Sequence, residues 1–297
     1  MRAYSFVTVD VFTERRFGGN PLAVFPDAHG LTDGEMQSLA AELNLSETTF
    51  VLPPDDPAHT ARVRIFNRTH EMPFAGHPNV GTGFVLAQAG RAKDDKLRFE
   101  ELAGLVEIEV ERDAAGAVTG ATIAAPQPLA LGIRLAPEAV AGCIGLAAAD
   151  IVTAAHPPLR AAVGNDFVIA EVTESGLARA IPDLAAFRRV LAETPALEGR
   201  FALYIYVRDG NGSRIRARMF SPIAGTWEDP ATGSAATPLA ALLLSLGTAQ
   251  SARYDIAQGV EMGRPSLLRT TARRTPDGIR AWVGGACVPV LRGEAMV

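Results

Sequence analysis

Hydrophobic and polar positions alternate over residues 3–12 of the chain, and this period of two predicts a strand. Two later segments, 33–44 and 183–193, instead place their apolar residues at helical spacing, and each begins at an Asp that suits a helix N-cap. A pair of strands is predicted after each helix, at 48–52 and 60–66 in the first half and at 201–207 and 214–220 in the second. The predicted elements therefore come in the same order twice.

Short sequence motifs repeat in the same order as these elements. A Gly-Asn pair opens a hydrophobic strand, and R-x-R-x-F and E-x-P-x-x-G-[HS] follow it; the first set lies at 19–20, 62–66 and 71–77, and the second at 164–165, 216–220 and 228–234. A helix that is apolar on nearly all sides is predicted after each E-x-P-x-x-G motif, at 78–89 and 235–246, and such a helix should be buried. We therefore expect an α+β fold in which a strand-rich layer wraps round one buried helix, and this unit is made twice.

The chain of 297 residues is long enough for two lobes, each with its own core. Pro- and Gly-containing sequence near 124–131 is the expected boundary, which gives an N-terminal lobe at 1–126 and a C-terminal lobe at 127–278. The remaining tail, 279–297, begins with strand-like alternation, and we expect it to join the N-terminal lobe.

Composition narrows the classes of function. The net charge is −5 and there is no basic run, so the electrostatic signature of a nucleic-acid-binding protein is missing. No segment reaches the ~20 apolar residues of a membrane helix, and the N-terminus lacks the apolar core of a signal peptide. We expect a cytoplasmic protein that does not bind membranes. Cys143 and Cys287 are expected to be small core residues rather than redox or metal sites.

The two E-x-P-x-x-G motifs place Gly76 and Gly233 in the turns just before the two buried helices. A glycine there allows a tight turn, and the free backbone N–H groups at the positive end of a helix favour an anion. Two such ends, one from each lobe, facing each other across a cleft would hold a carboxylate or an enolate-like transition state. The sequence lacks G-x-x-x-x-G-K-[ST], so a nucleotide phosphate loop is not supported. We predict a small anionic or carboxylate-bearing metabolite as the ligand.

Polar side chains follow these turns where a core would not need them, namely His77, Asp229 and Ser234. Asp229 and Ser234 equally suit helix caps, and His77 equally suits a structural hydrogen bond. His70 and Glu71 form an H-E pair, but the second His of the zinc-helix motif is missing and no Cys joins them. No metal site is therefore expected.

Glu47 lies between a predicted helix and an apolar strand. A carboxylate is costly to bury in such a strand unless it is paired or used. Desolvation would raise its pKa toward the range of a group that must take and return a proton. The alternative is an exposed glutamate at a strand edge.

Five phrases of the sequence, in order, resemble proteins of the phenazine-biosynthesis PhzF family; they lie at 10–24, 45–50, 71–78, 228–235 and 258–266. The resemblance runs almost end to end. It implies the diaminopimelate-epimerase fold, with two pseudo-symmetric lobes, each a curled mixed sheet around a central buried helix. It also implies a site between the lobes and a homodimer. By this resemblance Glu47 carries the proton, while His77, Asp229 and Ser234 hold the substrate.

The resemblance implies an isomerase that moves a proton without a cofactor. The biosynthetic member of the family isomerises trans-2,3-dihydro-3-hydroxyanthranilate, so the expected substrate is this compound or an analogue. A two-base racemase or epimerase is the other chemistry of the fold, but it needs a thiol before each glycine, where this chain has Ala75 and Thr232. A non-catalytic small-molecule-binding or regulatory protein on the same fold stays open as the second alternative.

Overall fold

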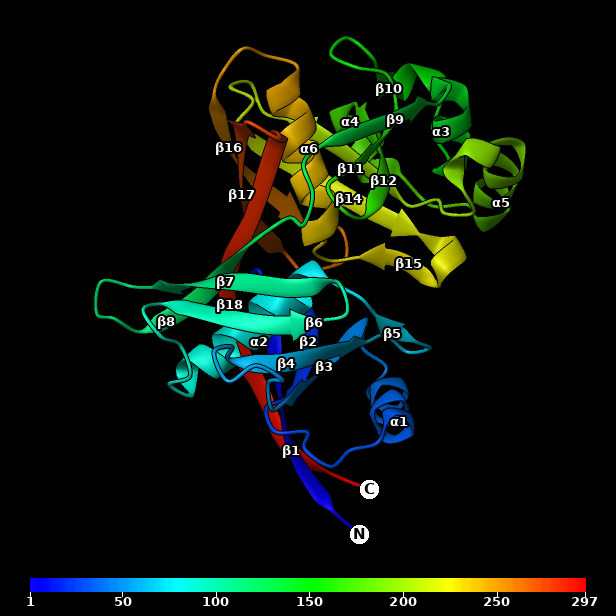
Figure 1. The fold of residues 1–297 in the computed structure, drawn as a ribbon. Helices are drawn as coiled ribbons and strands as arrows, with labels where there is room; N and C mark the ends of the chain where they lie inside the picture. Colours follow the sequence, from blue (N-terminus) through cyan, green and yellow to red (C-terminus); the bar gives the residue numbers. More distant parts are fainter. The chain divides into compact units, whose positions relative to one another are not determined.

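The computed structural model describes all 297 residues, and the chain forms two compact units. Unit 1 comprises Met1–Ala124 and Gly284–Val297, and unit 2 comprises Ala125–Val283. Each unit is a mixed sheet that curls around one central helix (Figure 1). The long C-terminal strand β18 (Gly278–Met296) contributes residues to both units.

The strands of unit 1 close into a barrel around helix α2. The elements are β1 (Ala3–Val11), β2 (Asn20–Phe25), α1 (Asp33–Leu43), β3 (Glu47–Leu52), β4 (Ala61–Phe66), β5 (Glu71–Met72), α2 (Gly76–Gln88), β6 (Lys96–Glu101), β7 (Gly104–Arg112) and β8 (Val118–Ala124). Pairings run β1–β2–β3–β4–β6–β7–β8–β18 and return to β1. The helix contacts strands on several sides of this barrel, so an apolar sequence suits it.

Unit 2 repeats the arrangement around helix α6. Its elements are β9 (Ala130–Arg134), α3 (Pro137–Cys143), β10 (Ile151–Val152), β11 (Leu159–Ala162), β12 (Asp166–Val172), α4 (Glu174–Arg179), α5 (Leu184–Glu193), β13 (Leu203–Arg208), β14 (Arg214–Ser221), β15 (Thr226–Asp229), α6 (Gly233–Ser245), β16 (Ser251–Gln258) and β17 (Ser266–Thr275), with short 3-10 turns at Ala148–Asp150, Pro195–Leu197 and Pro222–Ala224. The pairings β12–β13 parallel, β13–β14 antiparallel and β14–β16 parallel match β2–β3, β3–β4 and β4–β6 of unit 1. The sequence repeat is therefore a repeat of topology, and the predicted fold class is confirmed.

The paired motifs R-x-R-x-F and E-x-P-x-x-G build the same brace in both units. Arg64 makes two hydrogen bonds to Glu71, of 2.7 and 2.5 Å, and its guanidinium lies 5.1 Å from the centre of the Phe66 ring. Arg218 likewise makes two hydrogen bonds to Glu228, of 2.8 and 2.9 Å, and stacks 4.9 Å from the Phe220 ring. Each brace fixes the short strand that leads into the central helix, because a bidentate Arg–carboxylate pair sets orientation as well as distance.

Three predicted helix starts differ from the observed ones. Asp33 was expected to cap the first helix, but Thr32 is the N-cap and forms a capping box with Glu35. The reason is that Thr32 and Glu35 satisfy one another's backbone N–H groups, whereas Asp33 already has helical geometry. Each central helix also begins two residues earlier than predicted, at Gly76 and Gly233. The glycines and their neighbours therefore belong to the first turn and not to the loop before it.

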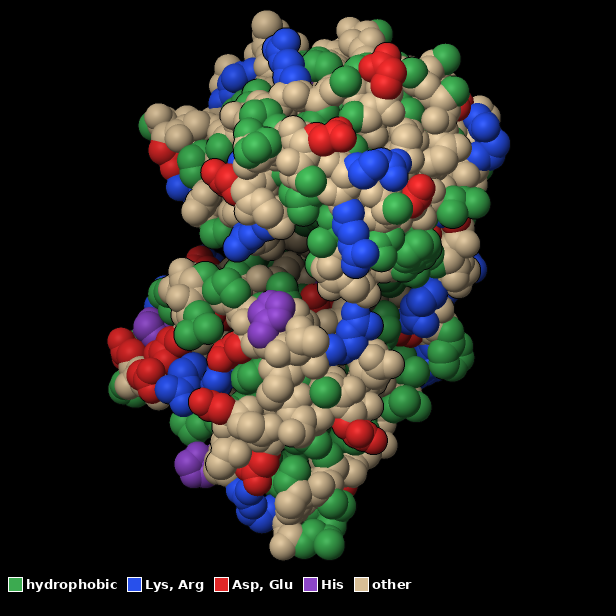
Figure 2. Space-filling view, turned by 90° about the vertical axis from the view of Figure 1, so that its right-hand side faces the viewer, with side chains coloured by type: hydrophobic (Ala, Val, Ile, Leu, Met, Phe, Trp, Pro, Cys, Tyr) green, Lys and Arg blue, Asp and Glu red, His purple; other side chains and the backbone are tan.

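Charged side chains are dispersed over the face of the molecule shown in Figure 2, with acidic and basic groups interspersed. None of the helices is both long and apolar enough to span a bilayer. Cys143 and Cys287 are both buried, as expected of small core residues. Burial raises the pKa of the Cys143 thiol to about 12, so this group is not an ionised nucleophile near neutral pH.

Candidate functional site

Glu47 is the first residue of β3 and lies on the face of that strand that looks toward α2. Side chains alternate along a strand, so Glu47 shares its face with Thr49. The Thr49 hydroxyl lies 2.8 Å from the hydroxyl of Thr82, a residue of α2. The Glu47 side chain is only 17% exposed. The alternative of an exposed glutamate at a strand edge is therefore not what the structure shows.

His77 occupies the first turn of α2 and brings an imidazole to this carboxyl. Its Nε2 lies 3.4 Å from Glu47 Oε2, and the ring is buried. Burial lowers the pKa of His77 to about 3, because a buried imidazolium loses its hydration. The pair is therefore a neutral imidazole beside a carboxyl and not an ion pair at neutral pH.

A neutral buried His77 should make the protein less stable as the pH falls. The folded-state pKa of about 3 lies below the ordinary value of 6.5, so the unfolded chain binds a proton that the folded chain does not between these values. As the pH falls from 7.5 to 5, protonation of His77 in the unfolded chain should lower the unfolding free energy by about 2 kcal/mol. Urea unfolding of the wild type and of His77→Gln at several pH values measures this, because glutamine does not titrate. Parallel stability curves for the two proteins would contradict it.

Further polar groups gather where the inner strands of unit 1 begin. Asn20 opens β2, and its Oδ1 accepts a hydrogen bond of 3.2 Å from Ser46, the neighbour of Glu47. Gly19 precedes it with φ +62, and a Cβ there would lie 2.4 Å from the Val11 carbonyl oxygen. Only glycine fits this position, which explains the Gly-Asn pair in the sequence. The pair thus supports the segment that leads into Glu47.

The start of α6 in unit 2 carries a second buried polar network. Thr232 donates from its hydroxyl to Asp229 and from its backbone N–H to Gln258 Oε1, at 3.2 Å in the second case. Gln258 Nε2 donates to the Asp229 carbonyl at 2.8 Å and to the Thr232 hydroxyl at 2.9 Å, while Tyr204 donates to Gln258 Oε1 at 3.1 Å. Ser234, in the first turn of α6, is half-buried. Gln258 is fully buried and holds the turn that carries Asp229.

The predicted residues therefore form one group in each unit. Glu47, His77 and Gly76 come together in unit 1, and Asp229, Ser234 and Gly233 come together in unit 2. The prediction that both groups face one ligand stays a prediction. Neither central helix has a side-chain cap at its N-terminus, as an anion-binding helix start requires. The roles of Thr232, Gln258 and Tyr204 were not predicted, because their contacts join strands far apart in the sequence.

No group of three or more His, Cys, Asp or Glu side chains is arranged to hold a metal ion. His70, the member of the H-E pair considered from the sequence, is exposed and contacts Asn67 and Thr69. Its neighbour Glu71 instead accepts two hydrogen bonds from Arg64. The residues of this pair therefore do not form a site together.

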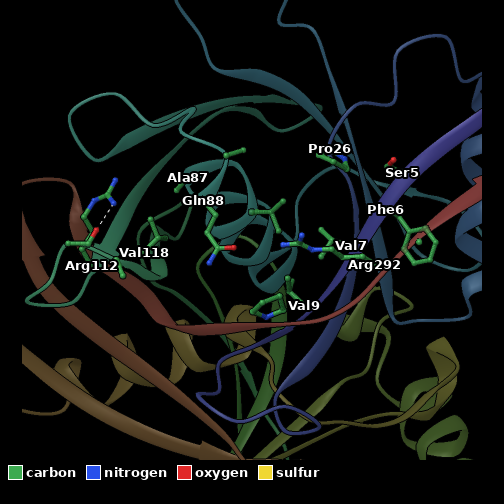
Figure 3. A pocket seen from close by; sticks show the side chains of 16 residues that line it. Ser5, Phe6, Val7, Val9, Pro26, Ala87, Gln88, Arg112, Val118 and Arg292 are labelled. Carbon is green, nitrogen blue, oxygen red and sulfur yellow. Dashed lines mark hydrogen bonds between the residues drawn. The ribbon is translucent and has the colours of Figure 1, made fainter.

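A separate pocket of about 710 Å³ lies in unit 1, beside the C-terminal end of α2 (Figure 3). Its wall includes apolar side chains of β1, such as Phe6, Val7 and Val9, together with Gln88 and Arg292. None of the predicted site residues lines it. The Glu47–His77 pair lies at the opposite end of α2 from this pocket.

Comparison with known proteins agrees with this architecture over the whole chain. The family model described as phenazine biosynthesis-like protein, PhzC-PhzF, matches residues 9–293. An uncharacterized isomerase of Mesorhizobium japonicum is 37% identical, and the match covers 100% of both chains. The trans-2,3-dihydro-3-hydroxyanthranilate isomerase of Pseudomonas chlororaphis is 36% identical over 99% of this chain and 100% of its own.

Solved structures show the same fold. The crystal structure of a PhzF-family protein from Bacillus anthracis superposes with a TM-score of 0.87 at 26% identity, covering 100% of both chains. The family model, the full-length relatives and this structure all agree. The chain belongs to the phenazine biosynthesis-like PhzC-PhzF family, and this membership and the isomerase names of the relatives from Mesorhizobium japonicum and Pseudomonas chlororaphis support an isomerase.

Proposed function

We propose that this chain is a cofactor-independent isomerase in which Glu47 alone takes a proton from the substrate and returns it to another atom. The observation that carries the proposal is the largely buried Glu47 carboxyl, 3.4 Å from a neutral His77 at the start of α2. A single carboxyl that acts first as base and then as acid can move a proton along one face of a planar, conjugated molecule. No redox change is needed.

The depressed pKa of His77 favours Glu47 over its neighbour as the base. A group with a pKa of about 3 is a weak base near neutral pH and leaves the proton on the substrate. The neutral imidazole can still donate one hydrogen bond from a ring N–H. His77 is therefore assigned to holding the substrate or the Glu47 carboxyl, and not to proton transfer.

The start of α2 supplies what the charge on the intermediate needs. Its first backbone N–H groups have no side-chain cap, and the positive end of the helix favours negative charge. We propose that Gly76 and His77 bind an anionic group of the substrate. Asp229, Gly233 and Ser234 are proposed as further substrate-binding residues, on the ground that they occupy the equivalent helix start in the repeated motif.

The proposed substrate is trans-2,3-dihydro-3-hydroxyanthranilate or an analogue that carries a carboxylate. A full-length relative that is 36% identical bears the name of an isomerase of this compound. The homodimer expected from the family resemblance remains part of the proposal. A thiol-based racemase is not supported, because Ala75 and Thr232 occupy the positions before the two glycines and neither carries a thiol. The Thr232 hydroxyl instead donates a hydrogen bond to Asp229.

Incubation of the protein with trans-2,3-dihydro-3-hydroxyanthranilate, followed by NMR, tests the proposal. We expect conversion of the compound without added metal or cofactor, after exhaustive dialysis against a chelator. Saturable binding without conversion, detected by thermal shift, would instead favour a non-catalytic binding protein on this fold. Neither binding nor conversion would remove this compound from the proposed substrates.

A further inference from the structure

Glu101 is a buried carboxyl next to the start of α2 that the proposed reaction does not use. It ends β6, on whose inner face Leu97 and Phe99 are fully buried, and alternation places Glu101 on that same face. The backbone N–H of Ala103, in the turn after β6, donates to the Pro73 carbonyl at 3.1 Å. This bond ties the β6–β7 turn to the segment that leads into Gly76.

If the Glu101 carboxyl is ionised, the buried hydrogen-bond acceptors around it outnumber the available donors. Both of its carboxyl oxygens are buried without a hydrogen-bond donor, and so is Oδ1 of Asn79 in the first turns of α2. Asn79 lies close enough to Glu101 to affect the carboxyl, yet its Nδ2 already donates to the Ala75 carbonyl at 3.1 Å. The second Nδ2–H of Asn79 can reach only one carboxyl oxygen, so Asn79 Oδ1 and the other carboxyl oxygen stay buried without a donor, at a cost of about 1–3 kcal/mol for each group. One added proton resolves it.

We propose that Glu101 is a protonated carboxylic acid that positions the start of α2. Its O–H donates to Asn79 Oδ1, and Asn79 Nδ2–H donates to the Ala75 carbonyl, the last carbonyl before Gly76. This relay fixes the turn whose N–H groups are proposed to bind the substrate, so Glu101 acts through Asn79 and not on the substrate itself.

Burial is consistent with this protonation state. It raises the pKa of Glu101 to about 8, and the Asn79 side chain offsets only part of the effect.

Other charged groups nearby are engaged elsewhere. Glu100 lies on the outer face of β6 and binds His59 and two backbone N–H groups. Among the charged groups of β4, which pairs with β6, Arg62 is paired with Asp55 and Arg64 with Glu71 and Asp33. In the first turn of α2, His77 is neutral and lies beside Glu47.

Loss of the Glu101 proton should loosen the relay. An ionised carboxylate can only accept, so Asn79 Oδ1 would lose its donor and lie against a negative charge, which favours rotation of the Asn79 amide away from the Ala75 carbonyl. The proposal therefore predicts weaker positioning of the α2 start above about pH 8. Glutamine at position 101 has a permanent N–H donor of nearly the same shape and should keep the relay at every pH.

Thermal unfolding tests the protonation state without any assay of activity. The folded-state pKa of Glu101 is raised, so its contribution to stability is lost as the pH rises from about 4.5 to about 8. We expect the melting temperature of the wild type to fall by roughly 5 °C relative to that of Glu101→Gln between pH 5 and pH 8.5. Glu100→Gln is the matched control: the pKa of Glu100 is lowered to about 2, so its difference from the wild type should stay constant over this range. A constant difference for Glu101→Gln as well would overturn the proposal.

Two further measurements complete the test. In wild-type protein with ¹³C-labelled glutamate carboxyls, one resonance should titrate near pH 8 and should persist in Glu47→Gln; its absence would overturn the proposal even if Glu101→Gln failed to fold.

The positioning role also rests on the proposed function and is measured with trans-2,3-dihydro-3-hydroxyanthranilate. We expect kcat/KM of the wild type to decline about tenfold per pH unit above pH 8, and this decline to be absent in Glu101→Gln. An unchanged decline would rule out the positioning role. No turnover by the wild type would count against the proposed substrate, while the unfolding and NMR results would still decide the state of Glu101.

Discussion

Replacing Glu47 by Gln is expected to lower kcat on trans-2,3-dihydro-3-hydroxyanthranilate by roughly 10²-fold or more. Glutamine keeps the size and shape of the side chain but can neither take nor return a proton. The neighbouring His77 cannot substitute as a base, because burial lowers its pKa to about 3. KM should change little, since the proposed binding groups are the helix N–H donors and not the carboxyl. Steady-state kinetics of the purified variant give both constants.

A surface carboxyl provides the control for this variant. Glu42 lies exposed on α1, so Glu42→Gln changes the charge of the protein by the same amount without touching the site. We expect wild-type kinetics from this control. An equal loss of kcat in both variants would mean that net charge, and not a specific proton carrier, sets the rate.

The largest loss of stability is expected from Arg218→Met. The Arg218 side chain is 7% exposed and pairs with Glu228, which is 13% exposed. It also donates to the carbonyls of Leu177 and Ala180, at 2.8 and 2.9 Å. Methionine would leave a buried carboxylate without its partner and two carbonyls without donors. We expect the unfolding free energy to fall by about 3–5 kcal/mol.

The equivalent brace in unit 1 gives a matched comparison. Arg64 and Glu71 are 19% and 20% exposed, so water can replace part of what Arg64→Met removes. We expect a smaller loss of roughly 1.5–3 kcal/mol. Both tryptophans, Trp227 and Trp282, belong to unit 2, so their fluorescence follows that unit while circular dichroism follows the whole chain. The fluorescence midpoint in urea should shift more for Arg218→Met; the reverse order would contradict the account of the two braces.

The repeated topology was predictable from the sequence because its signals are local. Each brace joins residues seven or ten positions apart, so the motif that encodes it is visible as a short pattern. The central helices were predictable for a similar reason, since each is apolar on nearly all sides. Their first turns were missed, because Gly76 and Gly233 resemble loop residues when read without the strands that enclose them.

The candidate site was predictable only in part, and mainly from its resemblance to a family. Glu47 and His77 are separated by two strands and a turn, and no local pattern shows that their side chains meet at 3.4 Å. The support around them was less visible still. Gln258 reaches the start of α6 from a later strand, and Glu101 reaches the start of α2 from β6. Such contacts depend on strand register, which the sequence alone does not determine.

Exchange of solvent deuterium into trans-2,3-dihydro-3-hydroxyanthranilate or its product tests the role of Glu47 most directly. The reaction is run in D₂O with the wild type, Glu47→Gln and His77→Gln, and deuterium at the reacting carbons is followed by NMR. If Glu47 carries the proton, and the proton exchanges with solvent before it is delivered, the wild type should incorporate deuterium at least about 10²-fold faster than Glu47→Gln, while His77→Gln retains measurable exchange. Near-normal exchange in Glu47→Gln together with none in His77→Gln would contradict the account and assign the proton to the imidazole.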